Sequence, residues 1–179
     1  KELSYNSRIS NPYILFVGAR STYKNFISLV KSMKNFPEIK LYIIGGGNFT
    51  KEESFVLDKY CKNNFKHFKN FDNDKLNDLY NSAICLVYPS LYEGFGIPVI
   101  EAMSAGCPVI ASNCSSITEI ATDSAILLDE TNDVSITEAI NKILIEENFD
   151  LFRKIGLKNS LNFSWDLTVQ KTIDSYNCI

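Results

Sequence analysis

The chain has 179 residues, with 21 acidic side chains against 18 lysines and arginines. A length of this order suits one domain that can bury a sizeable core. The basic residues are scattered along the sequence, which excludes the clustered basic face of a nucleic-acid-binding protein. No apolar run approaches the ~18 residues that a membrane-spanning helix needs. The sequence therefore predicts a globular domain in which a few placed side chains would hold any phosphate group.

The first element that we expect is a tether or the end of a linker over residues 1–12, which are mostly polar and start with Lys1 rather than Met. A chain without an initial Met suggests a piece of a longer protein. An apolar run over 13–17 then predicts a buried strand, followed by a helix that Pro37 ends. Further strands are predicted at 41–44, 66–68, 84–88, 108–111 and 125–128, and further helices at 52–62, 74–82, 98–104, 116–121, 134–146, 150–160 and 165–176.

Strands that alternate with helices define the expected fold class. Near-continuous apolar strands indicate a parallel sheet covered on both faces, and right-handed crossovers then give an α/β, Rossmann-like doubly wound sheet of about six strands over 13–179. Ligands of such sheets bind beyond the carboxyl ends of the strands. Four polar or glycine-containing loops lie at such ends, namely 18–24, 45–48, 90–96 and 113–119.

The segment 89–119 carries the strongest chemical signal. Gly94 and Gly96 lie between a predicted strand and a helix that we expect to begin at Pro98, where proline is favoured. A glycine loop at a helix N-terminus presents backbone N–H groups and partial positive charge to an anion. Glu93 and Glu101 flank this loop with seven residues between them. This arrangement predicts a site for a nucleotide-linked sugar.

Two cations, Arg20 and Lys24, flank the turn after the first strand. A guanidinium can bind two phosphate oxygens in a plane, and an ammonium acts as a compact point charge. Together they could offset the charge of a departing diphosphate without a metal. Glu101 could accept the hydroxyls of a ribose, while Glu93 could accept those of a transferred sugar or stabilise positive charge at its anomeric carbon.

Other sites are less well supported by the residues. The two carboxylates could in principle serve glycoside hydrolysis, but a hydrolase does not need a phosphate-type loop between them. The glycines at 45–47 fit a nucleotide loop or an ordinary turn, and the dinucleotide and P-loop glycine patterns are missing. His67 is the only histidine, so we expect no metal. Five cysteines without a C-x-x-C pair predict free thiols in a reducing compartment.

Three segments together resemble the donor-binding, C-terminal half of the retaining glycosyltransferases of family 4, which have the two-domain GT-B fold. The sequence of 16–20, followed by Lys24 and Asn25, is similar to the family's Gly-Arg…Lys-Asn diphosphate motif. Residues 93–101 match its Glu-x7-Glu motif closely, and 68–80 are similar to the segment that flanks the nucleotide base.

The resemblance implies specific roles. Arg20 and Lys24 would bind the donor diphosphate, and together with Glu93 they form the expected catalytic set. The family's Gly-Gly-x-Pro-Glu is replaced by Ser-Ser-Ile-Thr-Glu at 115–119, which weakens the expected role of that loop because serine disfavours positive φ. The expected donor-binding residues are Gly18, Arg20, Lys24, Gly45, Phe71, Glu93, Gly94, Phe95, Gly96, Ile97, Glu101 and Ser116.

The function implied is metal-independent, retaining transfer of a hexose from a UDP- or GDP-linked sugar, without a cofactor, to a glycan or lipid-linked acceptor. Bacterial surface polysaccharide such as O-antigen or lipopolysaccharide is the expected product by analogy. An N-terminal acceptor-binding domain would be the missing partner, so this chain would bind donor without transferring it. We expect a cytoplasmic location, at the inner membrane face for a lipid-linked acceptor, and no nucleic-acid partner. A sugar-nucleotide epimerase domain and a non-catalytic nucleotide-binding module stay open as alternatives.

Overall fold

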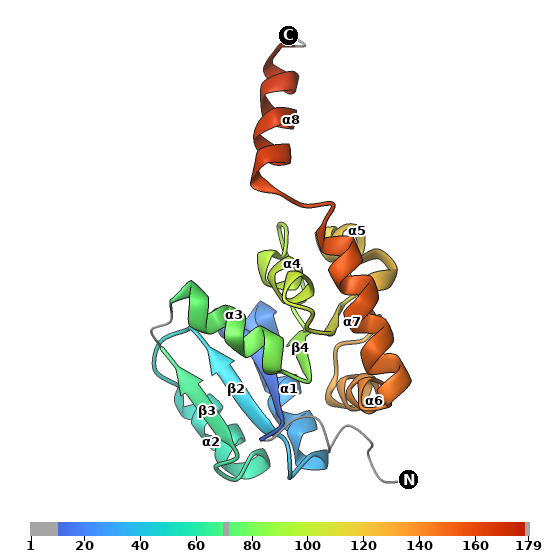
Figure 1. Ribbon diagram of the computed structural model, residues 1–179. Helices are drawn as coiled ribbons and strands as arrows, with labels where there is room; N and C mark the ends of the chain where they lie inside the picture. The colour runs from blue at the N-terminus through green and yellow to red at the C-terminus, as the bar shows by residue number, and fades with distance from the viewer. Residues whose placement is uncertain (1–10, 70–71, 178–179) are drawn as a thin grey trace.

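The computed structural model describes residues 11–69 and 72–177. Its centre is a parallel six-stranded sheet in the order β3-β2-β1-β4-β5-β6 (Figure 1), which confirms the predicted fold class. The strands are β1 (Tyr13–Val17), β2 (Lys40–Ile44), β3 (Phe65–Phe68), β4 (Cys85–Tyr88), β5 (Val109–Ser112) and β6 (Ile126–Leu128).

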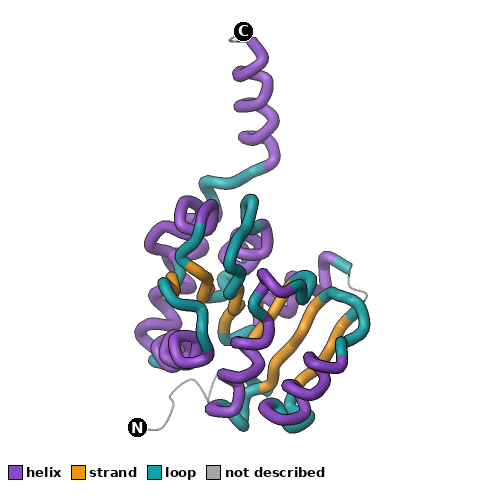
Figure 2. The backbone as a smooth tube through the Cα atoms, turned by 180° about the vertical axis from the view of Figure 1, so that it is seen from behind, coloured by secondary structure: helices purple, strands orange, loops and turns teal. Residues whose placement is uncertain are grey.

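Helices cover both faces of the sheet (Figures 1 and 2). The helices α1 (Phe26–Ser32), α2 (Lys51–Tyr60) and α6 (Asp133–Ile143) pack on one face, and α3 (Asn73–Ser82), α4 (Ile97–Ser104) and α5 (Ser115–Ala121) pack on the other. The chain closes with α7 (Glu146–Ser160) and α8 (Trp165–Asn177). Three short 3₁₀ turns complete the description: η2 (Thr22–Lys24), η3 (Met33–Asn35) and η4 (Thr122–Ser124).

The central strands β1, β4 and β5 are buried on both sides, as their sequence pattern predicts. In β1, Ile14 and Phe16 join the core beneath α1, α2 and α6, while Tyr13, Leu15 and Val17 join the core beneath α3, α4 and α5. All five side chains of this strand are buried. The central position of β1 therefore fixes where the loop that follows it leaves the sheet.

The predicted helix boundaries need one substantial correction. The helix predicted over 134–146 ends at Ile143, and the next begins at Glu146 rather than at residue 150. Ile145 is extended between the two helices, with φ −77° and ψ 125°, a break that the apolar spacing does not reveal. In addition, α4 begins at Ile97, so Pro98 occupies its second position rather than its first. The first helix, which Pro37 was expected to end, stops earlier, because α1 ends at Ser32 and the 3₁₀ turn η3 follows it. The other elements match their predicted ranges to within one or two residues.

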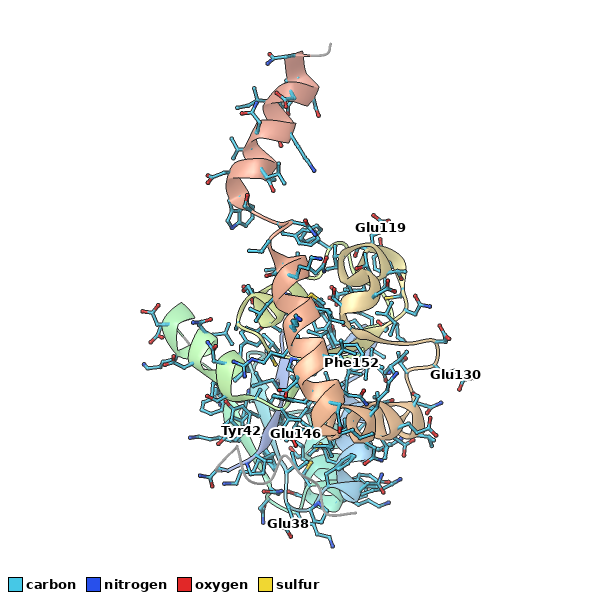
Figure 3. The ribbon with its side chains drawn as sticks, turned by 45° about the vertical axis from the view of Figure 1, so that its right-hand side comes forward. Glu38, Tyr42, Glu119, Glu130, Glu146 and Phe152 are labelled. Carbon is cyan, nitrogen blue, oxygen red and sulfur yellow. The ribbon has the colours of Figure 1, made fainter. Side chains whose placement is uncertain are left out.

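Helix α8 stands apart from the domain (Figure 1), with its side chains projecting all round (Figure 3). None of its residues is buried, and Trp165 is 77% exposed. In contrast, Phe152 places α7 against the core. Across the described residues, no helix has the length and apolar character required to cross a membrane. The free thiols predicted at Cys61, Cys85, Cys107 and Cys114 are confirmed, and Cys178 and residues 1–10 of the expected tether lie outside the described residues.

Candidate functional site

The switch in strand order falls between β1 and β4, which are neighbours in the sheet but distant in sequence. Ligands of doubly wound sheets bind at such a switch, beyond the carboxyl ends of the strands. The loops that leave β1 and β4 here are joined, because the Leu91 amide donates to the Tyr23 carbonyl at 2.7 Å. This junction brings the predicted Lys24 and Glu93 to one place.

Lys24 and Glu93 form a buried ion pair at this junction. The Lys24 ammonium donates to Glu93 Oε1 at 2.5 Å and to the Tyr88 hydroxyl at 2.9 Å. Each of the two charged side chains is 11% exposed, and Tyr88 is 2% exposed. An ammonium has three N–H donors, and these contacts use two of them. The pair can therefore hold a ligand anion on the lysine and ligand hydroxyls on the carboxylate.

The surroundings keep both groups charged. Burial alone would raise the pKa of Glu93, but the hydrogen bond from Lys24 and the nearby Ser90 and Tyr88 hydroxyls outweigh it and lower that pKa. Burial would lower the pKa of Lys24, but its hydrogen bonds to Glu93 and Tyr88 raise it. Burial also raises the pKa of Tyr88, so its hydroxyl stays protonated at neutral pH.

The glycine loop between β4 and α4 uses its two glycines differently. Gly96 has φ +104° and caps α4, and a Cβ atom there would lie 2.4 Å from Ile117 Cδ1. The fold itself therefore requires glycine at 96. Gly94 has no such φ, and no atom lies within 4 Å of a Cβ built there. Folding does not explain Gly94, whereas close approach of a ligand to the backbone would.

Ser116 reaches the same loop by an unexpected route. Its hydroxyl donates to the carbonyls of Glu93 and Phe95, each at 3.0 Å, and so fastens the glycine loop to α5. The sequence predicted a donor contact at Ser116, and the structure adds this loop-fastening role. Glu119 of the same helix is exposed and points outward (Figure 3).

Glu101 lies one turn into α4, where the sequence predicted it. The Tyr80 hydroxyl donates to Glu101 Oε2 at 3.2 Å, and Tyr80 itself is 1% exposed. Burial is the largest cause of a raised Tyr80 pKa, so this hydroxyl remains a donor at neutral pH. Phe95 on the glycine loop and Ile97 at the start of α4 are each about half exposed, so both are accessible to a ligand.

Arg20 does not join this group. Its guanidinium bonds to Glu53 Oε1 at 3.0 Å and to the carbonyls of Gly45, Gly47 and Asn48 at 2.9, 2.6 and 3.2 Å. Its side chain is only 4% exposed. In this structure the Arg20 guanidinium is committed to Glu53 and to the loop after β2. Its expected contact with a diphosphate stays a prediction.

The remaining predicted positions lie at the ends of β1, β2 and β3. The amides of Gly18 and Gly45 donate to Ile44 and Phe68, each at 2.9 Å, and so continue the sheet. The Gly45 carbonyl accepts from Arg20 and lies 3.0 Å from His67 Nε2. Phe71, expected near the base, lies outside the described residues.

Two polar groups of the site were not predicted. Tyr88 ends β4 beside the charged pair, and the Ser90 hydroxyl is buried with no hydrogen-bond partner among the described residues. Ser90 is nevertheless close enough to lower the pKa of Glu93. Both residues lie at the carboxyl end of an apolar strand, and that position was the signal that could have identified them as site residues. A buried hydroxyl of this kind is normally satisfied by a partner such as a ligand or water.

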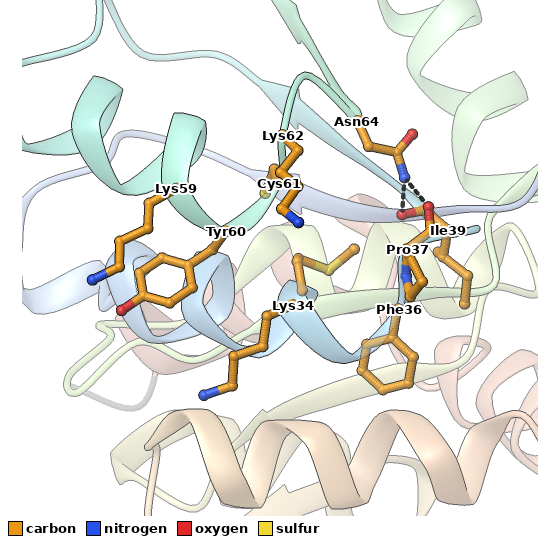
Figure 4. A pocket seen from close by; sticks show the side chains of 10 residues that line it. Lys34, Phe36, Pro37, Ile39, Lys59, Tyr60, Cys61, Lys62 and Asn64 are labelled. Atoms are coloured by element: carbon orange, nitrogen blue, oxygen red, sulfur yellow. Dashed lines mark hydrogen bonds between the residues drawn. The ribbon is translucent and has the colours of Figure 1, made fainter.

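A cavity of about 260 Å³, whose lining side chains are drawn in Figure 4, lies near the amino ends of β2 and β3. Two of its polar side chains are engaged by the protein: Asn64 donates to the carbonyls of Pro37 and Ile39, and Lys34 pairs with Asp133. Within the described part of the chain, no cluster of three histidine, cysteine or acidic side chains could hold a metal ion. The region beyond the carboxyl ends of β1 and β4 is therefore the stronger candidate site. The cavity is lined by Met33, Lys34, Phe36, Pro37, Ile39, Lys59, Tyr60, Cys61, Lys62 and Asn64.

Comparison with known proteins agrees with this geometry. The sequence profile of the glycosyl transferases group 1 matches residues 4–158. The chain belongs to this family. It is 31% identical over 178 residues to O-antigen chain mannosyltransferase B of Escherichia coli, covering 93% of this chain and 46% of that protein. The chain thus spans about half the length of this relative.

Solved structures of GT-B glycosyltransferases share the fold. The Anabaena protein HepE, solved with UDP and glucose, superposes with a TM-score of 0.86 at 17% identity, over 99% of this chain and 51% of that one. The C-terminal domain of LpcC, a glycosyl transferase group 1 protein of Francisella tularensis, gives a TM-score of 0.75 at 19% identity over 90% of both chains. At these identities the likeness shows the fold alone.

Proposed function

We propose that this glycosyltransferase domain binds a nucleoside-diphosphate sugar and is the donor-binding half of a retaining, metal-independent hexosyltransferase. The observation that carries the proposal is the buried Lys24–Glu93 pair at the switch point, beside a glycine whose identity folding does not explain. Lysine suits a phosphate oxygen, and a carboxylate suits sugar hydroxyls. The two groups would contact the two parts of one donor.

The chemistry follows from the charges. As the bond between the anomeric carbon and the diphosphate lengthens, negative charge grows on the leaving oxygens and positive charge grows on the sugar. Lys24 would stabilise the first and Glu93 the second, without a metal ion. Glu101 would accept the ribose hydroxyls, while the Gly94 amide would approach the donor. Retention would follow if the acceptor attacks from the face that the leaving phosphate occupies.

The names of the relatives support a more specific proposal for the sugar and the acceptor. A relative named as an O-antigen mannosyltransferase favours mannose as the sugar. Of the two carriers expected from the sequence, we propose GDP. The similarity to an isolated C-terminal domain supports a further, acceptor-binding half elsewhere in the protein. We propose a glycan or lipid-linked acceptor for that half, which would place the reaction at the cytoplasmic face of a membrane.

Calorimetric titration of the chain with GDP, UDP, GDP-mannose, UDP-glucose and NAD, each with and without Mg²⁺, tests this proposal. We expect one nucleoside diphosphate and its sugar ester to bind regardless of Mg²⁺. The variant Gly94→Ala should fold and lose about tenfold in affinity, because a side chain there would crowd the ligand. Gly47→Ala is the matched control, since Gly47 also lacks both a positive φ and near neighbours. Selective binding of NAD, or equal losses in the two variants, would contradict the proposal.

A further inference from the structure

Tyr88 is a neutral side chain at the centre of the pair's surroundings. Its hydroxyl accepts at 2.9 Å from the same Lys24 ammonium that donates to Glu93, and it lies close enough to Glu93 to lower the pKa of that carboxyl. Buried tyrosine hydroxyls usually find a partner, and a backbone carbonyl is sufficient for that purpose. Here the partners are instead the two charges of the candidate site.

We propose that Tyr88 is a positioning residue, which sets the spacing between the Lys24 ammonium and the Glu93 carboxylate that a nucleotide sugar would meet. This inference rests on the function proposed above. Because the hydroxyl stays protonated, it can accept from the lysine and donate to the carboxylate at the same time. Tyr88 does not touch the reacting atoms in this scheme, and it acts through its two neighbours.

The need for such a residue follows from the flexibility of lysine. An ammonium on a four-carbon stem has no fixed direction, and opposite charges left alone would turn fully toward each other. A second acceptor fixes the ammonium at two points and leaves one N–H for a phosphate oxygen. A donor to Glu93 likewise fixes that carboxylate. Small displacements of such groups are costly, on the order of 10²-fold in rate for 1 Å.

Tyr13 supplies a matched control on the neighbouring strand β1. It is buried like Tyr88, at 6% exposure, but its hydroxyl donates to the Leu79 carbonyl at 2.8 Å. Burial raises the pKa of Tyr13 to about 12, so this hydroxyl does not titrate in acid. Tyr13→Phe and Tyr88→Phe therefore remove the same hydroxyl oxygen from similarly buried positions. Only Tyr88→Phe removes it from the candidate site.

The first measurement is the melting temperature of the ligand-free chain from about pH 3 to about pH 8. Lys24 from η2 and Tyr88 from β4 are titratable groups that face Glu93, and both stay protonated over this range. Because Glu93 has a lowered pKa, its ion pair stabilises the fold above the ordinary glutamate pKa and is lost as pH falls. Removing the Tyr88 hydroxyl raises that pKa, so acid destabilisation should begin at higher pH.

Tyr13→Phe should lower the melting temperature by a similar amount at every pH in this range. The shift of acid destabilisation to higher pH in Tyr88→Phe should also vanish in a Glu93→Gln background, where the titrating carboxylate is absent. If the melting temperature of Tyr88→Phe instead depends on pH in the same way as that of Tyr13→Phe, the Tyr88 hydroxyl does not hold Glu93 and the inference is overturned.

The second measurement is affinity for GDP-mannose, UDP-glucose, GDP and UDP. Tyr88→Phe should weaken the sugar ester that binds wild type by about tenfold, and its nucleoside diphosphate by about threefold at most. Tyr13→Phe should leave both unchanged. Unchanged affinity in Tyr88→Phe, despite the acid shift, would overturn positioning while leaving the proposed function intact. A wild-type chain that binds none of the four probes would overturn the proposed function, and the donor role of Tyr88 with it.

Discussion

Arg20 and Lys24 leave the same loop four residues apart, yet they enter two different networks. The Arg20 guanidinium is bound by Glu53 and three backbone carbonyls, and it lies 4.5 Å from the centroid of the Phe49 ring. The Lys24 ammonium is bound by one carboxylate and one hydroxyl. Both cations are nearly buried, so burial does not separate them. Their partners do.

The partners decide which cation can accept a ligand. The carbonyls around Arg20 belong to the loop after β2, and releasing the guanidinium would leave that loop without its central donor. Gly46 has a positive φ, and a Cβ atom there would lie 2.3 Å from the Arg20 guanidinium, so the loop is folded around the arginine. Side chains such as Glu93 and Tyr88 can form new pairs without refolding the backbone. Binding of a phosphate would therefore require less rearrangement of the protein at Lys24 than at Arg20.

The largest expected effect comes from breaking the Arg20 network. Arg20→Ala leaves Glu53 buried without its ion-pair partner, and Glu53→Gln weakens the same contact from the other side. Removing one member of a buried pair costs about 3 kcal/mol of unfolding free energy or more, which urea denaturation would measure. We expect both variants to lose stability, with Arg20→Ala the larger loss.

Affinity distinguishes a framework role for Arg20 from the predicted contact with a diphosphate. If Arg20 only shapes the loop, the folded fractions of Arg20→Ala and Glu53→Gln should bind GDP-mannose within about threefold of wild type, less than the loss of one charged hydrogen bond. A much larger loss in Arg20→Ala alone would show that the guanidinium leaves Glu53 to bind phosphate. The comparison between the two networks would then fail.

The variant Lys24→Met tests the second network, in which we expect the cation to bind the donor. A charge-assisted hydrogen bond is worth about 1.5–3 kcal/mol, so we expect donor affinity to fall by about 10- to 100-fold. Some stability should also be lost, because Glu93 keeps its burial without its counter-ion. Lys51→Met, at an exposed position on α2, is the control for loss of one positive charge. If titration gives the same donor affinity for both variants, Lys24 does not bind the diphosphate.

Most of the fold was predictable because its signals are local. Buried parallel strands appear as apolar runs such as 13–17, and Gly96 marks the turn into α4 through its positive φ. The break at Ile145 was missed because Ile145 ends an apolar run, Ile143 to Ile145, that extends the apolar pattern of α6 past its last turn. Hydrophobic spacing records which face is buried, and it does not record where a backbone bends.

The site was predictable where a motif is continuous in sequence and less so where side chains meet across strands. The spacing of Glu93 and Glu101 already places them around the glycine loop. The directions of Arg20 and Lys24 could not be read from their spacing, because an irregular loop has no fixed side-chain period. From the sequence alone Tyr88 resembles any other residue of an apolar strand, and only the pairing of β4 with β1 brings its hydroxyl to the Lys24 ammonium.

The two loops also differ in how firmly they are fastened, and Ser116 gives the smallest expected effect. A buried cation fastens the loop after β2, whereas a neutral hydroxyl fastens the glycine loop through the Glu93 and Phe95 carbonyls. A neutral hydrogen bond contributes about 1 kcal/mol net, so Ser116→Ala should lower unfolding free energy by about that amount and donor affinity by about threefold.

Ser160→Ala is the matched control for Ser116→Ala. Ser160 is also shielded from solvent, but its hydroxyl donates to the Leu157 carbonyl within α7 and has no contact with the glycine loop. Hydrogen exchange of the glycine-loop amides would report the fastening directly, and we expect faster exchange in Ser116→Ala alone. Equal exchange in the two variants would mean that packing against α5 fastens this loop. Because Gly96 lies against Ile117 and Ile120 of that helix, the packing alternative predicts that shortening Ile117 to alanine loosens the loop where Ser116→Ala does not.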